Sequence, residues 1–181
     1  VVSEIEVLEE PAFKRREIRS TGWWGIKNKL NYVSVAELGD RVYQWGFKQP
    51  SPILHCFSQL LPHDKYFESH PEWYPLINGK RSFGEGHPKG KVQLCVSNEE
   101  MRAEFAKNLA AMMAAHPHAD TWEIYPMDMS MGWCECEHCR ALDESDPMTF
   151  NTVIEKAIDE SSGSPRRWGR RYTYFVNDIA G

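Results

Sequence analysis

The stretch that decides the fold expected for this chain is VQLCVSNEEMRAEFAKNLAAMMAAHPHADTWEIYPMD, residues 92–128. Its first residues have the apolar character of a buried strand. Ser97 and Glu100 then have the form of a capping box, and apolar side chains follow at helical spacing as far as His116. Residues 121–128 return to a strand-like pattern. A strand, a helix and a second strand in this order predict a βαβ unit, in which the two strands pair in parallel.

The remaining segments predict further elements of the same kind. Strands are expected at residues 17–25 and 52–57, and helices at residues 34–46, 146–163 and 172–179. Residues 61–91 form a long irregular stretch rich in aromatic residues, which favours an ordered functional loop. The last helix has an apolar face in need of a partner, so we expect the chain to be a piece of a longer protein. We therefore predict an α/β fold that corresponds to part of a barrel.

The composition limits the classes of function. The chain has 181 residues, enough for one domain, with 41% hydrophobic and 26% charged residues. Its net charge of −5 argues against a general nucleic-acid binder, because such proteins need a basic face to neutralise phosphates. No apolar run approaches the roughly 20 residues that span a bilayer, so we expect no membrane span. The first residues also lack the profile of a signal peptide.

Three cysteines lie close together in the sequence, at Cys134, Cys136 and Cys139. Tetrahedral zinc needs four ligands, so one ligand must come from elsewhere. We favour Cys95, because Cys95 and the three cysteines follow the two strands of the same βαβ unit, whose carboxyl ends meet at one edge of a parallel sheet. His138 is the alternative fourth ligand. A disulfide between two of these cysteines, or reduced thiols in a loop, would also fit the pattern.

Asp128 stands at the end of the second strand of this predicted unit. A parallel strand delivers such a side chain to the edge from which catalytic groups project in α/β barrels. A carboxylate that caps a turn or a helix would occupy the same position. His55 ends another predicted strand, where it would either line a pocket or be a core histidine.

A second group of candidate residues, His70, Glu72 and Trp73, lies in the long irregular stretch. Aromatic rings that stack on sugar faces, next to charged groups that hold hydroxyls, suit a polyhydroxylated ligand. The same aromatic residues could instead anchor the loop in the core. Trp23 and Trp24 admit the same two interpretations.

Three runs of sequence together resemble one family. They are residues 11–16 (PAFKRR), residues 70–98 from HPEWY through GKR to QLCVSN, and residues 128–142, which include WCECEHCRAL. In these runs the chain is similar to domain-of-unknown-function family 4838, found in bacterial carbohydrate-related proteins and similar in turn to the barrels of β-hexosaminidases and α-glucuronidases. This resemblance implies a partial (β/α)8 TIM-type barrel, roughly its first half, with parallel strands and flanking helices. It also implies sugar binding at the carboxyl-terminal face of the strands and a secreted, periplasmic or cell-surface location.

The resemblance also implies roles for single residues. In hexosaminidase-like barrels the arginine of a Pro-x-Phe-x-x-Arg element holds sugar hydroxyls, and that position falls on Arg16 here, although Glu17 follows where the pattern usually has glycine. Those enzymes carry an Asp-Glu pair after the fourth strand, whereas this chain has Asp128 and Met129. Glycoside hydrolysis generally needs two carboxyl groups, for which the candidates are Asp128 and Glu72. The expected sugar-binding residues are Arg16, Trp23, Trp24, His55, His70, Trp73, Asn98 and Trp133.

The sequence thus predicts a carbohydrate-active, glycoside-hydrolase-like domain that binds an oligo- or polysaccharide and is a candidate for hydrolysing it. A structural zinc ion is the expected cofactor, with no organic cofactor, and its ligands would be Cys95, Cys134, Cys136 and Cys139. The remainder of a longer chain would close the barrel. The alternative is a non-catalytic module that binds glycan or protein and has a purely structural cysteine site.

Overall fold

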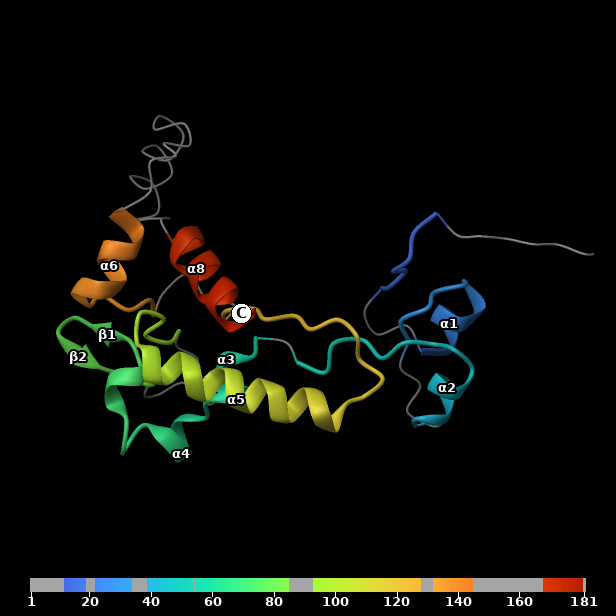
Figure 1. The fold of residues 1–181 in the computed structure, drawn as a ribbon, viewed down its shortest axis with the longest axis horizontal. Helices are drawn as coiled ribbons and strands as arrows, with labels where there is room; N and C mark the ends of the chain where they lie inside the picture. Colours follow the sequence, from blue (N-terminus) through green and yellow to red (C-terminus); the bar gives the residue numbers. More distant parts are fainter. Residues whose placement is uncertain are drawn as a thin grey trace, which may run out of the picture. The chain divides into compact units, whose positions relative to one another are not determined.

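The computed structural model divides the chain into two compact units, which we describe separately (Figure 1). Unit 1 comprises Val1–Pro52 and His116–Trp122, and unit 2 comprises Ile53–Ala115 and Glu123–Gly181. Within these units the structure describes residues 12–18, 22–33, 39–53, 55–84, 93–127, 132–144 and 168–180.

The described residues of unit 1 include the short helices α1 (Gly22–Lys27) and α2 (Arg41–Gln44). An isolated parallel bridge joins Tyr32 to Lys48. Tyr32 is buried, and its hydroxyl donates a hydrogen bond of 2.6 Å to the Asp120 carboxylate. This bond ties the later segment of unit 1 to the earlier one.

Unit 2 holds the other described elements. In chain order they are α3 (Phe57–Leu60), α4 (His63–Tyr66), a 3₁₀ helix (Pro71–Trp73), the strands β1 (Leu76–Ile77) and β2 (Lys80–Arg81), α5 (Glu99–Ala115), α6 (Glu137–Glu144) and α8 (Trp168–Ala180). Phe57, Phe105 and Phe175, from α3, α5 and α8, meet edge to face with ring centroids 5.8, 5.4 and 5.0 Å apart. All three rings are fully buried, so they form the centre of the core.

Helices α5 and α8 confirm two of the helices predicted from apolar spacing. Asn98 is the N-cap of α5, because its side-chain Oδ1 accepts a hydrogen bond of 2.8 Å from the Met101 amide. The actual cap therefore lies one residue after Ser97, where the capping box placed it. Glu99 and Glu100 in the first turn complement the positive end of the helix dipole.

The structure describes the irregular stretch expected over residues 61–91 as far as residue 84, and this part includes a tight hairpin. Ile77 pairs with Lys80 across the two-residue turn Asn78-Gly79. Both turn residues have positive φ, 49° for Asn78 and 76° for Gly79, as a type I′ turn requires. Asparagine and glycine are the residues that adopt this conformation most readily.

The prediction of a partial (β/α)8 barrel is wrong. Among the described residues the only sheet is the antiparallel pair β1–β2, and the only parallel pairing is the single bridge in unit 1. Residues 22–27, expected at the end of a strand, form helix α1. Residues 93–96 and 121–127, expected to form the parallel strands on either side of α5, contain no strand.

Side chains and backbone geometry explain why no ladder forms in these segments. The Gln93 side chain bonds both main-chain groups of Met127, donating to the carbonyl at 2.8 Å and accepting from the amide at 3.0 Å. A side chain therefore takes the place that a neighbouring strand would occupy. Pro126 has no N–H to offer to a ladder. His55, in another expected strand, has a φ of 51°, which a strand does not adopt.

Two of the predicted helices cannot be followed in full. The helix expected over residues 146–163 lies outside the described residues, and so does the start of the one expected over residues 34–46, of which α2 forms part. Within the described part of the chain, no helix combines the length and the apolar character needed to cross a bilayer.

Candidate metal centre

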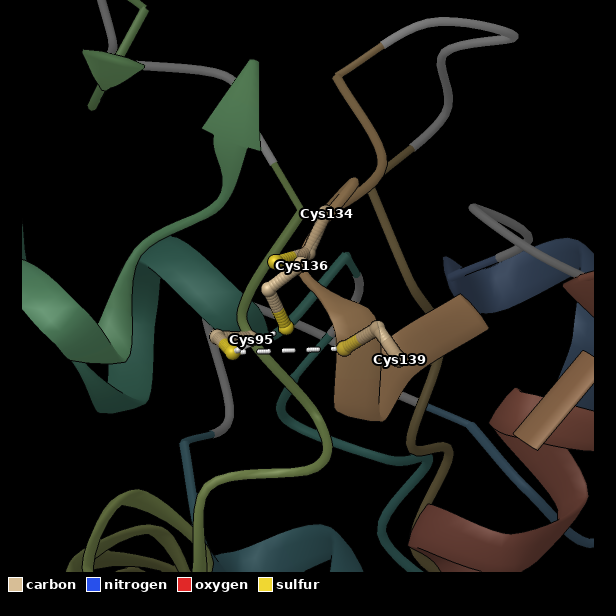
Figure 2. A group of neighbouring side chains, drawn as sticks. All are labelled: Cys95, Cys134, Cys136 and Cys139. Atoms are coloured by element: carbon tan, nitrogen blue, oxygen red, sulfur yellow. Dashed lines mark hydrogen bonds between the residues drawn. The ribbon is translucent and has the colours of Figure 1, made fainter. Parts of the chain in front are cut away.

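Four cysteine sulfurs gather in unit 2 (Figure 2). Cys95 lies shortly before α5, Cys134 and Cys136 precede α6, and Cys139 lies in the first turn of α6. The four sulfur atoms lie within 4.8 Å of one another, and all four cysteines are free. The Cys95 sulfur is 3.7 Å from the Cys136 sulfur and 3.9 Å from the Cys139 sulfur.

These spacings fit a metal ion held by sulfur. A tetrahedral zinc ion with Zn–S bonds of about 2.3 Å places its ligand sulfurs about 3.8 Å apart. A disulfide would instead require an S–S distance of about 2.05 Å. The four cysteines could therefore hold a metal ion, and three of them, Cys95, Cys134 and Cys139, are buried from solvent.

Backbone hydrogen bonds fix the segments that carry the cysteines. The Cys95 amide donates to the Trp73 carbonyl at 2.9 Å, which attaches this segment to the 3₁₀ helix. The Glu135 amide donates to the Leu76 carbonyl at 2.8 Å, which places residues 134–136 beside β1. The hairpin, the segment before α5 and the segment before α6 thus converge on the sulfurs.

Donor groups of the protein surround the sulfurs. The Leu76 amide donates to the Cys134 sulfur at 3.3 Å, and the Arg81 guanidinium donates to the same sulfur at 3.7 Å. The Ser97 hydroxyl lies 3.1 Å from the Cys139 sulfur. Donors in these positions stabilise a thiolate over a neutral thiol and orient it toward a metal.

The cysteine cluster accommodates one negative charge more easily than four. Hydrogen bonds from Cys134 and Cys139 lower the pKa of the Cys95 thiol far below its usual range. A hydrogen bond from Cys139 favours ionised Cys134 too, but the hydrogen bond to Cys95, burial and the charge on Cys95 outweigh it and raise the pKa of Cys134 to about 11. Hydrogen bonds to Cys134 and Cys95, together with burial, raise the pKa of Cys139. A bound divalent cation would supply the charge that allows all four thiols to ionise.

Comparison with known proteins identifies the family. The family model described as a domain of unknown function, DUF4838, matches residues 1–181. The chain belongs to the DUF4838 family. No curated protein and no solved structure matches it. The resemblance to this family seen in the sequence is thus confirmed, whereas the wider likeness to β-hexosaminidases and α-glucuronidases stays a prediction.

The structure describes one member, Glu72, of the expected catalytic pair of this DUF4838 chain. Asp128 lies outside the described residues. Glu72 lies in the 3₁₀ helix, with its Oε1 atom 3.4 Å from the His70 Nδ1 atom. His70 stacks on Trp73 with ring centroids 4.0 Å apart and ring planes within 8° of parallel. Trp73 itself is buried, so its ring anchors the core, as the alternative interpretation of this loop expected.

Three further sugar-binding candidates of unit 2 make contacts within the protein. Asn98 caps α5, as described above. The His55 Nδ1 atom lies 3.0 Å from the Pro126 carbonyl oxygen. The Trp133 ring lies beneath the Arg171 guanidinium, whose central carbon is 5.8 Å from the ring centroid. All three side chains therefore have a structural part in unit 2.

The remaining candidates, Arg16, Trp23 and Trp24, belong to unit 1. The Arg16 guanidinium donates to the carbonyl oxygens of Lys29 at 2.8 Å and Phe13 at 2.9 Å, so it links two backbone segments. Trp23 and Trp24 lie on α1 with 46% and 53% of their surface exposed. These two rings are open to a ligand.

Sequence reasoning does not identify Ser97 and Arg81 as neighbours of the cysteine sulfurs. The sequence pattern marks Ser97 only as a helix cap. The Asn78-Gly79 pair is a strong hairpin signal, and it would have placed Arg81 on a strand. No pattern in the sequence, however, indicates that this strand lies beside Cys134.

Proposed function

We propose that Cys95, Cys134, Cys136 and Cys139 bind one Zn²⁺ ion and that this ion is a structural centre of unit 2. The observation that carries the proposal is the set of S–S spacings, 3.7 and 3.9 Å from Cys95, with all four sulfurs within 4.8 Å of one another. Cys95 and Cys139 are 44 residues apart in the sequence, so a shared metal ion would link distant parts of the chain.

The ligand set favours zinc in a structural role. Thiolates are soft ligands, which select zinc or iron over calcium and magnesium. Four protein ligands complete a tetrahedron and leave no open position for a substrate, as in structural zinc sites. Iron is the competing metal, and a ferric tetrathiolate centre would be coloured, whereas a zinc centre is colourless.

The surroundings of the sulfurs support this assignment. Four thiolates around Zn²⁺ carry a net charge of about −2, which needs donors nearby. The Leu76 amide and the Arg81 guanidinium supply two such donors to Cys134. Burial alone would lower the pKa of Arg81, but the thiols, Cys95 foremost, outweigh burial and raise it, so the guanidinium stays charged beside the site.

For the chain as a whole we propose a glycan-binding module in which the zinc centre stabilises unit 2 and unit 1 carries the glycan contact. The exposed indole rings of Trp23 and Trp24 support this function, since such rings stack on the C–H-rich faces of sugars. Binding of a protein partner is the alternative for the same surface. Hydrolysis of the glycan remains a prediction, in which Asp128 and Glu72 would have to lie roughly 5 to 9.5 Å apart.

Metal analysis tests the zinc proposal. The purified chain should contain one zinc per molecule, and Co²⁺ in its place should give the visible absorption of tetrahedral thiolate coordination. Cys139→Ser should lose the metal, whereas Cys56→Ala, which removes a buried cysteine outside the cluster, should retain it. Protein prepared with ample zinc that contains no metal, or that contains paired disulfides, would overturn the proposal.

A glycan-binding screen tests the module. The chain should retain a subset of oligosaccharides, and the double change Trp23→Ala with Trp24→Ala should abolish retention. Trp45→Ala is the matched control, because Trp45 is an exposed tryptophan of the same unit. Equal retention by the double variant and the control would rule out the two rings as the glycan contact.

A further inference from the structure

A buried arginine on α8 holds the backbone of the cysteine segment. Arg171 is only 2% exposed. Its Nη1 atom donates to the Cys134 carbonyl at 2.8 Å, and its Nη2 atom donates to the Cys139 carbonyl at 3.1 Å. Its Nε atom donates to Asp143 Oδ1 at 3.0 Å, and Nη2 also pairs with Asp143 Oδ2. One guanidinium therefore engages both ends of the segment that carries three of the four thiols.

This geometry suits arginine in particular. The guanidinium presents its donors as a rigid planar fork, which here bonds the Asp143 carboxylate in bidentate fashion while it reaches two carbonyl oxygens. The carboxylate also neutralises the buried positive charge. Lysine carries the same charge as a single point and cannot fill all of these positions at once. The Arg171 contacts thus set the distance between Cys134 and Cys139.

A second arginine connects α8 to the segment of the fourth thiol. The Arg102 Nη1 atom donates to the carbonyl of Val96, the residue after Cys95, at 3.0 Å. The Arg102 Nε atom donates to Asp178 Oδ2 at 2.5 Å. Asp178 lies seven residues after Arg171, so both project from one side of α8. Phe175 lies between them and is fully buried in the aromatic core.

We propose that α8 is a latch on the metal centre, with Arg171 as the positioning residue that holds the three-cysteine segment in its ligating shape. The inference rests on the proposed function, because it requires that the four thiols bind metal. Arg171 contacts no sulfur in this scheme; it acts through the carbonyl groups of Cys134 and Cys139. This coupling is reciprocal. If the docking of α8 raises the metal affinity by some factor, bound metal favours the docked α8 by the same factor.

The test compares two arginine variants of the full chain. Arg171→Lys should bind zinc about 10- to 100-fold more weakly in competition with a chelator, the usual effect of removing a partner that orients ligands. Arg140→Lys is the matched control, since Arg140 is an exposed arginine on the same helix as Cys139, and its affinity should equal that of the wild type. The Co²⁺ absorption bands should shift in Arg171→Lys and stay unchanged in the control, because they report the geometry of the four sulfurs.

A second experiment measures the reverse effect, that of bound zinc on the amide hydrogen exchange of α8. Removal of zinc should speed amide hydrogen exchange in residues 168–180, and re-addition should restore the slow exchange. If Arg171→Lys does not fold, Asp178→Asn replaces it, since this side chain is 44% exposed and the change removes the negative charge that pairs with Arg102. For this variant we expect a weakening of several-fold in zinc affinity.

The outcomes separate the two proposals. A wild-type chain that takes up no zinc would refute the structural centre itself. A wild-type chain that binds zinc, combined with unchanged affinity and unchanged Co²⁺ bands in the α8 variants, would overturn the latch and leave the zinc centre standing. Zinc-independent exchange in α8 would overturn it as well.

Discussion

The thiols of Cys56 and Cys95, both in unit 2, have pKa values shifted in opposite directions. Burial raises the pKa of the Cys56 thiol to about 12, so this thiol is neutral at physiological pH and is a poor ligand. Hydrogen bonds from neighbouring thiols lower the pKa of Cys95 instead. The Cys56 sulfur lies outside the cluster, so no shared metal ion could offset the cost of ionising it, as one could for the raised thiols of Cys134 and Cys139.

At the scale of single residues, a change at Ser97 tests whether the hydrogen-bond donors around the sulfurs stabilise the thiolates. Its hydroxyl lies 3.1 Å from the Cys139 sulfur and 3.6 Å from the sulfurs of Cys95 and Cys136. Ser97→Ala removes a donor without touching a ligand, so zinc affinity should fall by about 10-fold, the lower end of the effect of such partners. Chelator competition measures the change, and Ser69→Ala, at an exposed serine, should cause none. A Ser97→Ala chain with wild-type affinity would show that the hydroxyl does not stabilise the thiolates.

At the residue scale the sequence predicts the cysteine group well. Spacing alone joins Cys134, Cys136 and Cys139, and the expectation of two parallel strands adds Cys95 to them. The strands are absent from the described residues, yet the segments they were assigned to do lie together, because Gln93 bonds the main chain of Met127. The expected proximity is therefore correct although the expected pairing is wrong.

At the scale of elements, the hairpin β1–β2 depends on its turn. Gly79 has a φ of 76° and nothing within 4 Å of where a Cβ atom would stand, so a substitution there meets only backbone strain. Gly79→Ala should destabilise unit 2 by about 1 kcal/mol, the usual cost of a left-handed conformation for a residue with a Cβ atom.

Gly79→Asn is the matched variant for this prediction, because asparagine tolerates the left-handed conformation better than alanine does. It should lose less stability than Gly79→Ala in urea denaturation. Equal losses of stability in the two variants would show that Gly79 does not stabilise unit 2 through its left-handed turn conformation.

Helices α5 and α8 were predictable, whereas the parallel strands expected on either side of α5 do not form. Apolar spacing identifies α5 and α8 because each buries one face against the aromatic core, where Phe105 and Phe175 meet. Short apolar runs such as residues 93–96 carry no periodicity that separates a strand from a buried extended segment. What excludes a ladder there is the contact between Gln93 and Met127, which belongs to tertiary structure.

At the scale of the molecule, unit 1 has its own source of pH sensitivity. The Tyr32 hydroxyl, followed by Lys48, lowers the pKa of Asp120. The folded pKa thus lies below the unfolded value, so the ionised carboxylate contributes stability above about pH 4, and this contribution is lost as the pH falls through the folded pKa. Acid should therefore weaken unit 1.

The change Tyr32→Phe tests whether the bond between Tyr32 and Asp120 gives unit 1 this pH sensitivity. It should raise the pKa of Asp120 toward its usual value and cost about 1 kcal/mol at neutral pH, a modest amount because Asp120 is partly exposed to solvent. Carboxyl titration by NMR and denaturation at neutral and acid pH measure both effects. Tyr43→Phe, at another tyrosine of unit 1, should leave the Asp120 pKa unchanged; a shift of equal size there would contradict the assignment.

The two units should respond differently to loss of metal. All four cysteines belong to unit 2, so a chelator should lower the stability of that unit alone. At free zinc 1,000 times the dissociation constant, the difference should be about 4 kcal/mol. Calorimetry with and without chelator measures it, and hydrogen exchange in residues 22–33 of unit 1 serves as the internal control. Equal loss of protection in both units would show that the metal stabilises more than unit 2.

The position of Arg171, 37 residues after Cys134, has a consequence for biosynthesis. A ribosome that adds about 5 to 20 residues per second synthesises the last of these thiols, Cys139, roughly 2 to 6 s before the arginine, which follows it by 32 residues. During that interval the nascent chain presents the complete set of sulfurs before Arg171 can hold the segment that carries three of them. Metal bound by the proposed centre at this stage should still exchange fast, and translation of α8 should convert this loose capture into a slowly dissociating one.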